Sequence, residues 1–469
     1  MQSPTAKAVG FSMREDMERI HLSEHFTYKK LIKFVMPSVA MMVLVSVYGI
    51  VDGFFVSNFA GAIPFAALNL IYPLIMILGS VGFMLGTGGN AVVSKALGEG
   101  DDAKAKRIFS MLIYATIIIG AALSLVGILA ARPVAELFAS TEKEMSTEDR
   151  AVLIEYCVVY ARIILLALPA FMLQNAFQGF FVTAEKPRLG LYTTLAAGCG
   201  NMVMDALFVV GFKGGLVGAA IATALSQCIG GLLPLLYFAR KNDSLLRLGK
   251  THFDGKVFIS VCINGLSELM TNIALSVVAI VYNAQLMRYV ALNGVAAYGI
   301  INYIGFIFIA VFIGYSVGVS PIVGYHYGAQ NRNELKNIFT KSNMIMLTLG
   351  GLMAGFAVVF AEPFSKIFTN GDRELLALTV HGLRLYAICF LFCGMNIFAS
   401  SFFTALSNGL ISLILSFLRV FVLPIVAVCI LPTFWAVEGI WLSMVVAELM
   451  GFAISYVFLS WKRKYYGYW

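Results

Sequence analysis

Residues 86–98 read Gly-Thr-Gly-Gly-Asn-Ala-Val-Val-Ser-Lys-Ala-Leu-Gly, and residues 316–328 read Ser-Val-Gly-Val-Ser-Pro-Ile-Val-Gly-Tyr-His-Tyr-Gly. The two stretches align, and the offset that takes Gly86 to Ser316 also relates other segments of the chain. These segments are Ala66-Ala67 with Ala296-Ala297, and Lys106-Arg-Ile-Phe109 with Lys336-Asn-Ile-Phe339. An internal repeat of this length predicts a chain built from two similar halves.

A second, slightly shorter offset relates the later parts of the two halves. It pairs Asn175-Ala-Phe177 with Asn396-Ile-Phe398, Phe181-Val-Thr-Ala184 with Phe402-Phe-Thr-Ala405, and Gly218 with Gly439. The offset changes at the acidic connection 140–150, which is longer in the first half. The repeat therefore extends over most of the chain.

The composition indicates that lipid is the main solvent of this protein. Of its 469 residues, 60% are hydrophobic and 12% are charged, whereas soluble domains carry roughly 25% charged residues. The net charge of +8 comes from basic residues that cluster at the ends of apolar runs, as the positive-inside rule predicts. Because no basic run is interleaved with aromatics, we expect no nucleic-acid partner.

Several soluble chemistries are excluded by the motifs that the sequence lacks. The seven cysteines lie inside apolar runs without a CxxC pattern, and the five histidines have no metal-ligand spacing. The pattern GxxxxGK[ST] is absent, which argues against ATP-driven pumping by this chain. The polar segment 1–27 does not read as a signal peptide. We expect no enzyme and no cofactor beyond a coupling ion.

Twelve segments are apolar for the roughly 20 residues that a transmembrane helix needs. They are 31–58, 64–96, 105–131, 152–182, 188–211, 214–239, 254–286, 294–327, 335–361, 375–405, 409–431 and 434–461. The predicted fold class is all-α integral membrane, with two six-helix bundles. Because six is even, both bundles enter from the same side and form parallel repeats, and a substrate site is expected at their interface.

Loop charge predicts the orientation of these helices. Four even-numbered connections are basic, at Lys104–Arg107, Lys186–Arg188, Arg240–Lys256 and Arg332–Lys336, and the remaining one, 407–409, carries no charge. Both termini are therefore expected in the cytoplasm of a multi-pass plasma-membrane protein. The predicted parts are a cytoplasmic segment 1–27, a first bundle 28–240, a linker 241–253, a second bundle 254–461 and a cytoplasmic tail 462–469.

Charged residues inside the spans are the candidates for function, because each costs roughly 2.5–3.5 kcal/mol to insert. Four acids lie well inside predicted spans: Asp52, Asp205, Glu268 and Glu448. Arg162, Arg384 and Arg419 are read as structural counter-ions without a transport role.

Asp205 is the strongest candidate for binding a coupling cation. Asn201 lies four residues earlier on the same predicted helix face, and the short turn 211–215 brings Thr223 to a similar depth. Asp52 is expected at that depth too. Asp52, Asn201, Asp205 and Thr223 are therefore predicted to bind Na⁺ or a proton, with hydrogen bonding between helices as the alternative. Glu268 and Asn175 are assigned to substrate binding.

These residues resemble the multidrug and toxic compound extrusion (MATE) family, and its MepA-like branch. The resemblance rests on Tyr48-Gly-Ile-Val-Asp52, Ser94-Lys-Ala-Leu-Gly98 and Gly218-Ala-Ala-Ile-Ala-Thr223, and covers about residues 28–460. It implies two bundles in a V around a central cavity, and antiport of cationic amphipathic compounds against Na⁺ or H⁺. The tenth span, 375–405, lacks the acid that some members carry.

The expected function is cation-coupled export of drugs or metabolites by alternating access, which can confer antibiotic resistance, and the expected partners of this monomer are a small-molecule substrate and the lipid bilayer. The main alternative is a flippase for lipid-linked precursors, although the extra helices and strongly basic cavity of such proteins are not evident. A channel or a membrane-embedded enzyme is the third alternative. No His/Asp or Ser/His cluster supports an enzyme.

Overall fold

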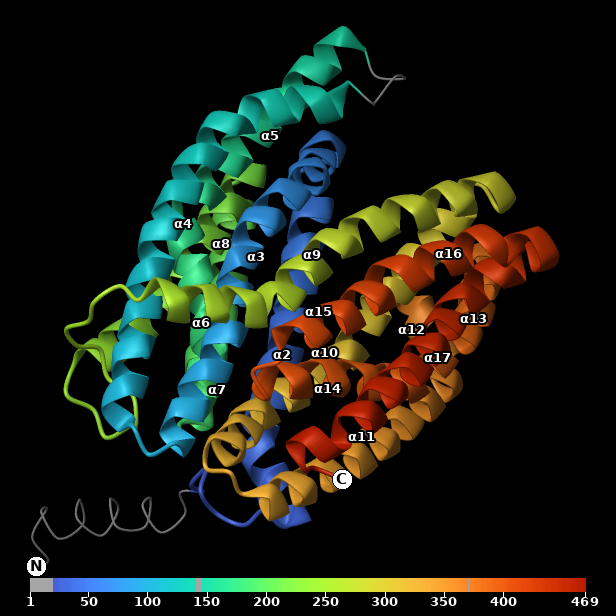
Figure 1. Cartoon of the computed structure of the whole chain (residues 1–469). Coiled ribbons are helices and arrows are strands. Elements are labelled where there is room, and N and C mark those ends of the chain that lie inside the picture. Colours follow the sequence, from blue (N-terminus) through green and yellow to red (C-terminus); the bar gives the residue numbers. More distant parts are fainter. Residues whose placement is uncertain (1–19, 141–145, 370) are drawn as a thin grey trace, which may run out of the picture.

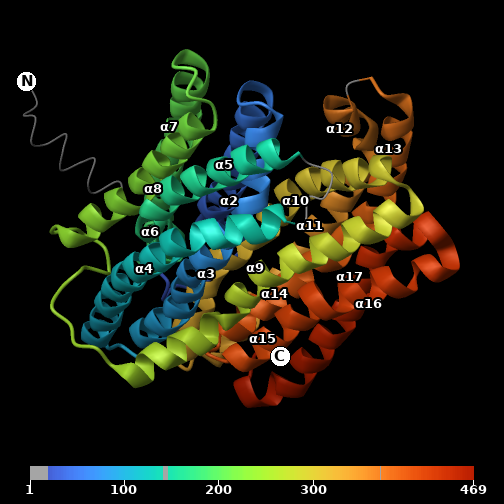
Figure 2. The ribbon, with the colours of Figure 1, turned by 90° about the horizontal axis from the view of Figure 1, so that it is seen from above.

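The chain folds into two helical bundles in the computed structural model, which describes residues 20–140, 146–369 and 371–469. The first bundle, the N-lobe, contains α2 (Tyr28–Phe59), α3 (Ala62–Gly98), α4 (Asp102–Ala139), α5 (Thr147–Leu166), α6 (Leu168–Thr183), α7 (Pro187–Asp205), η1 (Ala206–Gly211) and α8 (Gly215–Ala239). Figures 1 and 2 show this lobe in blue to green. Parts of the predicted segment 1–27 and of the acidic connection 140–150 lie outside the described residues.

The second bundle, the C-lobe, follows the linker and is drawn in yellow to red in Figures 1 and 2. It contains α9 (Gly255–Tyr289), α10 (Leu292–Gly328), α11 (Arg332–Val359), α12 (Ala361–Phe368), α13 (Arg373–Tyr386), η2 (Ala387–Cys389), α14 (Phe390–Ala405), α15 (Gly409–Phe417), η3 (Leu418–Val422), α16 (Leu423–Ile430) and α17 (Pro432–Tyr466). In Figure 1 the two bundles meet toward the lower end and diverge upward.

The described residues confirm the prediction of an all-helical membrane protein with twelve spans. Eleven helices or helix series are long and apolar enough to cross a membrane, and the bent pair α5 and α6 supplies the twelfth. These two helices meet at 54°. The bend falls next to Pro169, whose ring cannot continue a regular helical hydrogen-bond pattern.

Three other spans contain a short π-helical or 3₁₀ stretch, and α17 has a kink at Ala436. The fifth span continues from α7 into the π-helical turn η1, and the eleventh contains the π-helical turn η3. A short 3₁₀ turn, η2, joins α13 to α14 within the tenth span. π-helical turns release backbone groups from the regular pattern and are frequent at functional sites.

Polar residues fix where several helices begin. Asp101, Ser146, Asp254 and Asn408 each accept a backbone N–H from the first turn of the following helix. Such caps satisfy donors that would otherwise have no partner at a helix start. They place the helix starts within a few residues of the predicted spans, although α4 and α17 run beyond their predicted ends at 131 and 461.

Glycines of the repeated stretches lie where the two lobes touch. A Cβ added to Gly98 on α3 would lie 1.9 Å from the carbonyl oxygen of Tyr325, and one added to Gly328 on α10 would lie 2.1 Å from that of Lys95. Gly265 on α9 likewise faces the backbone of Met84. Only glycine permits this approach of two backbones. We call this end of the molecule, which carries the basic connections, the basic end.

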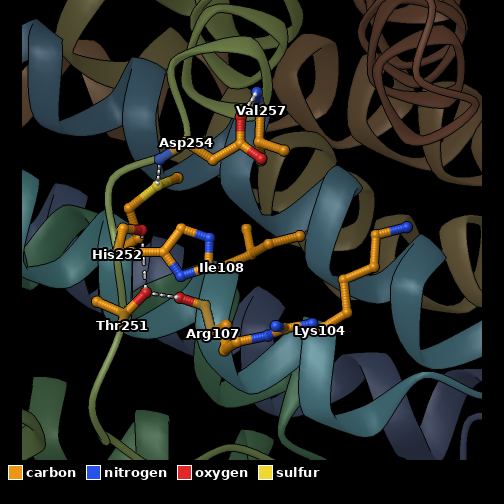
Figure 3. Close-up of a pocket in the computed structure, with 8 residues that line it drawn as sticks. Lys104, Arg107, Ile108, Thr251, His252, Asp254 and Val257 are labelled. Carbon is orange, nitrogen blue, oxygen red and sulfur yellow. Dashed lines mark hydrogen bonds between the residues drawn. The ribbon is translucent and has the colours of Figure 1, made fainter.

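The linker between the lobes packs along α4 at the basic end. The Gly249 N–H donates to Ser110 Oγ at 3.1 Å, and Thr251 Oγ1 donates to the carbonyl oxygen of Arg107 at 2.9 Å. A hollow of about 200 Å³ remains beside it. Figure 3 shows this hollow between Lys104 and Arg107 of α4 and His252 of the linker. It lies outside the membrane-spanning core that holds the predicted site.

Candidate ion-binding site

The predicted ion ligands on α7 lie on one buried face of that helix. Asn201 is 1% exposed and Asp205 is 0% exposed, and Thr194, Ala197 and Gly198 continue the same face. The four-residue spacing predicted this common face. Asp205 is also the last α-helical residue before η1, so the carboxyl group sits at the point where the span changes its helical pitch.

Two neighbouring helices bring their predicted ligands to the Asp205 carboxyl group. Asp52 on α2 lies close enough to Asp205 for the two carboxyl groups to interact. Thr223 on α8 donates its hydroxyl to Asp52 Oδ1 at 3.3 Å. The structure therefore places Asp52, Asp205 and Thr223 together, with Asn201 one turn away from Asp205 on α7. Their role as ion ligands stays a prediction.

The polar atoms of this group have few partners among the described residues. Neither carboxylate oxygen of Asp205 and neither amide atom of Asn201 receives or donates a hydrogen bond there. Buried polar groups are normally paired. Two carboxylates that face each other repel unless a proton or a cation lies between them. The arrangement can therefore bind a proton or a hard monovalent cation.

The donor atoms of this group are all oxygens. In the part of the chain that the structure describes, no three His, Cys, Asp or Glu side chains come together as metal ligands. Two carboxylates, one amide oxygen and one hydroxyl are hard oxygen donors, which suit cations such as Na⁺ more than zinc or copper. We call Asp52, Asn201, Asp205 and Thr223 the N-lobe acid site.

The two candidate substrate residues lie in different lobes. Glu268 on α9 has a partly buried side chain, and the Arg419 guanidinium is close enough to interact with its charge. Asn175 on α6 is 9% exposed, and its Nδ2 has no hydrogen-bond partner among the described residues. Among the described residues, no hydrogen bond joins Asn175 to Glu268. Their assignment to substrate binding stays a prediction.

A buried charged cluster in the C-lobe was not recognised from the sequence as a unit. Arg419 Nε donates to the two carboxylate oxygens of Glu448 at 2.9 and 3.0 Å, and Asn396 Nδ2 donates to Glu448 at 2.7 Å. Arg419 also approaches Cys393. The counter-ion reading of Arg419 identified half of the pair. Asn396 is the first residue of a repeated segment, and this position was the only feature of the sequence that pointed to its part in the cluster. We call Arg419, Glu448 and Asn396 the C-lobe ion pair.

The fold and these groups define a polytopic membrane transporter. Two parallel helical bundles touch at one end, and the buried Asp205 carboxylate has no hydrogen-bond donor among the described residues. Ionisable groups at such depth mark ion or substrate pathways. The MatE family model matches residues 37–207 and 269–430, so the chain belongs to the MatE family. The two matched blocks fall in the two lobes, as the internal repeat predicts.

The relatives with similar sequences are drug exporters of the MepA type. The multidrug export protein MepA of Staphylococcus saprophyticus is 24% identical over 398 residues, covering 81% of this chain and 84% of the relative. MepA of Staphylococcus aureus strain MRSA252 is 24% identical over 452 residues, covering 92% and 94%. The chain is thus a MepA-like transporter of small molecules and not an enzyme.

Solved structures support the fold. A MATE structure in complex with MaL6 superimposes with a TM-score of 0.87 at 19% identity, covering 95% of this chain and 98% of that chain. A structure described as the outward-facing conformation of a multidrug resistance MATE family transporter gives a TM-score of 0.85 at 20% identity, covering 95% and 97%. The prediction of a MATE-like architecture is confirmed.

Proposed function

We propose that this protein exports cationic amphipathic compounds in exchange for Na⁺ or H⁺, and that the N-lobe acid site binds the coupling ion. The observation that carries the proposal is the buried Asp205 carboxyl group, which faces Asp52 and receives no hydrogen bond from any other described residue. An ion that enters this site removes the repulsion between the two carboxylates. Binding of the ion therefore changes how the surrounding helices α2, α7 and α8 pack.

Antiport follows if the ion and the substrate stabilise different states of the transporter. A ligand shifts a two-state equilibrium only by its differential affinity for the two states. Asp52 lies on α2, whose inner half packs against α10 of the opposite lobe at Gly314 and Gly318. An ion bound at Asp52 and Asp205 can thus affect the lobe interface, because the single helix α2 contacts both places. In this proposal the basic end faces the cytoplasm.

The substrate class follows from Glu268 and from the relatives. Glu268 is an acid on the first helix of the C-lobe, beside the lobe interface at Gly265, and it attracts a positively charged compound. The similar relatives carry the printed name multidrug export protein. A cationic amphipathic compound satisfies both observations, because its charge pairs with Glu268 and its apolar part contacts the apolar span surfaces.

The experiment is efflux of a fluorescent organic cation from proteoliposomes, with a Na⁺ gradient and a pH gradient imposed separately. We expect one gradient to drive efflux and the other to have no effect, which names the coupling ion. Protein that is shown to be folded but silent under both gradients would contradict the proposal. That result would favour the flippase alternative, which the same vesicles test with a labelled lipid-linked precursor.

A further inference from the structure

The short segment that precedes α2 is held between the two lobes at the basic end. Residues 20–27 contain a turn in which the Glu24 N–H donates to the His21 carbonyl oxygen at 3.2 Å. Leu22 and Phe26 are both 0% exposed. Their core cluster joins Val182 of the N-lobe to many C-lobe residues. We call residues 20–27 the strap.

One end of the strap is hydrogen-bonded to a carboxylate of the N-lobe. His21 Nδ1 lies 2.8 Å from Glu185 Oε2, and the Leu22 N–H donates to Glu185 Oε1 at 2.7 Å. Glu185 lies in the turn between α6 and α7, where it has a φ of 58° and is 7% exposed. A non-glycine residue at positive φ is uncommon, so this turn presents the carboxylate at some conformational cost.

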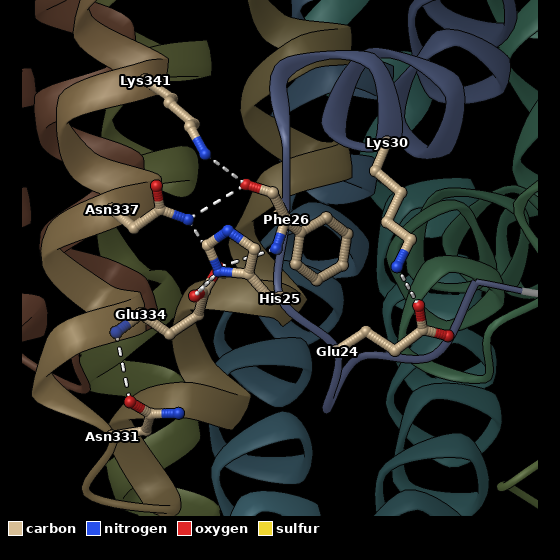
Figure 4. Close-up of polar contacts among 8 residues, drawn as sticks. All are labelled: Glu24, His25, Phe26, Lys30, Asn331, Glu334, Asn337 and Lys341. Carbon is tan, nitrogen blue, oxygen red and sulfur yellow. Dashed lines mark hydrogen bonds and ion pairs between the residues drawn. The ribbon is translucent and has the colours of Figure 1, made fainter.

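The other end of the strap is hydrogen-bonded to a carboxylate of the C-lobe in the same way. His25 Nδ1 lies 2.6 Å from Glu334 Oε2, and the Phe26 N–H donates to Glu334 Oε1 at 2.8 Å. Two further side chains of α11, Asn337 and Lys341, donate to the Phe26 carbonyl oxygen at 3.0 and 2.6 Å. Figure 4 shows these groups converging from α11 on the strap.

The two sets of contacts have the same pattern, in which a histidine ring and the next backbone N–H meet one carboxylate. They differ in the lobes that they connect. The strap continues directly into α2, which belongs to the N-lobe. The contact of His21 with Glu185 therefore ties the strap back to its own lobe. The contact of His25 with Glu334 ties the same segment to the opposite lobe.

We propose that the contact of His25 and Phe26 with Glu334, Asn337 and Lys341 is a latch that keeps the basic end closed and must release each time that end opens. The inference rests on the proposed function, because alternating access requires the lobes to separate at this end. Hydrogen bonds to a charged group are stronger than those between neutral groups. Loss of one such bond shifts the ratio of closed to open molecules on the order of tenfold.

The first test locks the strap to one lobe or the other. In a functional background without native cysteines, His25→Cys with Glu334→Cys is linked by a short reducible bis-methanethiosulfonate reagent. His21→Cys with Glu185→Cys is the matched control. We expect the first link to lower organic-cation transport at least tenfold and reduction to restore it. The control link should change transport less than twofold. Undiminished transport with the first link in place would overturn the latch.

The second test does not depend on transport. Spin labels at Lys106 and Lys336, exposed residues at equivalent positions of the two lobes, report the separation of the lobes at the basic end. Glu334→Gln should increase the population with long distances by about tenfold, and Glu185→Gln should leave the distribution unchanged. Identical distributions in both variants and the parent would overturn the latch. Failure of the proposed function alone would leave this distance result intact.

Discussion

The N-lobe and the C-lobe both bury acids but give them different hydrogen-bond partners. In the N-lobe, Asp205 is fully buried and neither of its carboxylate oxygens has a donor among the described residues. In the C-lobe, Glu448 is 2% exposed and accepts hydrogen bonds from Arg419 and Asn396. The buried acid of the C-lobe is paired within the protein, whereas the buried Asp205 of the N-lobe receives no such hydrogen bond from the described residues.

The repeat shows that this difference is not a difference of fold. At the offset that takes Gly86 to Ser316, Asp52 corresponds to Tyr282, whose hydroxyl lies 2.8 Å from Ser443 Oγ. At the second offset, which takes Asn175 to Asn396, Glu448 corresponds to Gln227 and Asp205 to Val426. The acids of each lobe thus occupy positions where the other lobe has neutral residues. The duplicated architecture thus holds two facing acids in one half and an ion pair in the other.

The first prediction concerns a substitution in the N-lobe acid site, for which we expect the largest effect. Asp205→Asn should abolish gradient-driven transport, because the site loses the charge that attracts a proton or Na⁺. Folding and melting temperature should be preserved, since the variant removes a buried charge that has no partner among the described residues. Efflux from proteoliposomes and thermal unfolding in detergent measure the two effects. Gradient-driven transport retained by the purified variant would contradict the role of Asp205.

The second prediction attacks the C-lobe ion pair and should affect stability. Glu448→Gln leaves the buried Arg419 charge without its counter-ion, which we expect to destabilise the folded state by about 3 kcal/mol. Thermal unfolding in detergent measures this change. The control is the double variant Arg419→Met with Glu448→Leu, which removes both charges and should recover most of the loss. A single variant as stable as the parent would show that Glu448 is not held as an ion.

The third prediction concerns recognition and is the smallest of the three. Glu268→Gln should weaken binding of a cationic substrate by about tenfold, as for one desolvated charge pair, and binding of a neutral substrate by less than twofold. Ser38, which corresponds to Glu268 in the repeat, supplies the matched control Ser38→Ala. Equal effects of Glu268→Gln on both substrates would exclude direct recognition of charge.

Much of the fold was accessible from the sequence because it depends on local composition. Runs of about 20 apolar residues predicted twelve spans, and the repeated stretches predicted two lobes with Gly98 and Gly328 in equivalent positions. The candidate ion site was accessible for a related reason. A four-residue spacing placed Asn201 and Asp205 on one helix face, and a short turn fixed the depth of Thr223.

The bend between α5 and α6 could be predicted only in part from the sequence, and the π-helical turn η1 could not be predicted. Pro169 indicated a kink, but the angle of 54° depends on the helices that pack around it. Residues 201–210 contain no glycine or proline, and Gly211 at the end of η1 marks only the predicted turn 211–215. Glu448 likewise reads as another intramembrane acid until the fold brings α17 beside Asn396 and Arg419.

The sequence by itself determined that this protein spans a membrane twelve times in two related halves, and which acids lie inside the spans. Those properties follow from hydrophobicity and spacing over stretches of chain no longer than a helix. Only the tertiary structure decided which buried acids are paired with a basic group and which have no such partner among the described residues. It also decided that His25 meets Glu334, which is far away along the chain. Such contacts depend on how helices pack against one another, and neither composition nor periodicity encodes that geometry.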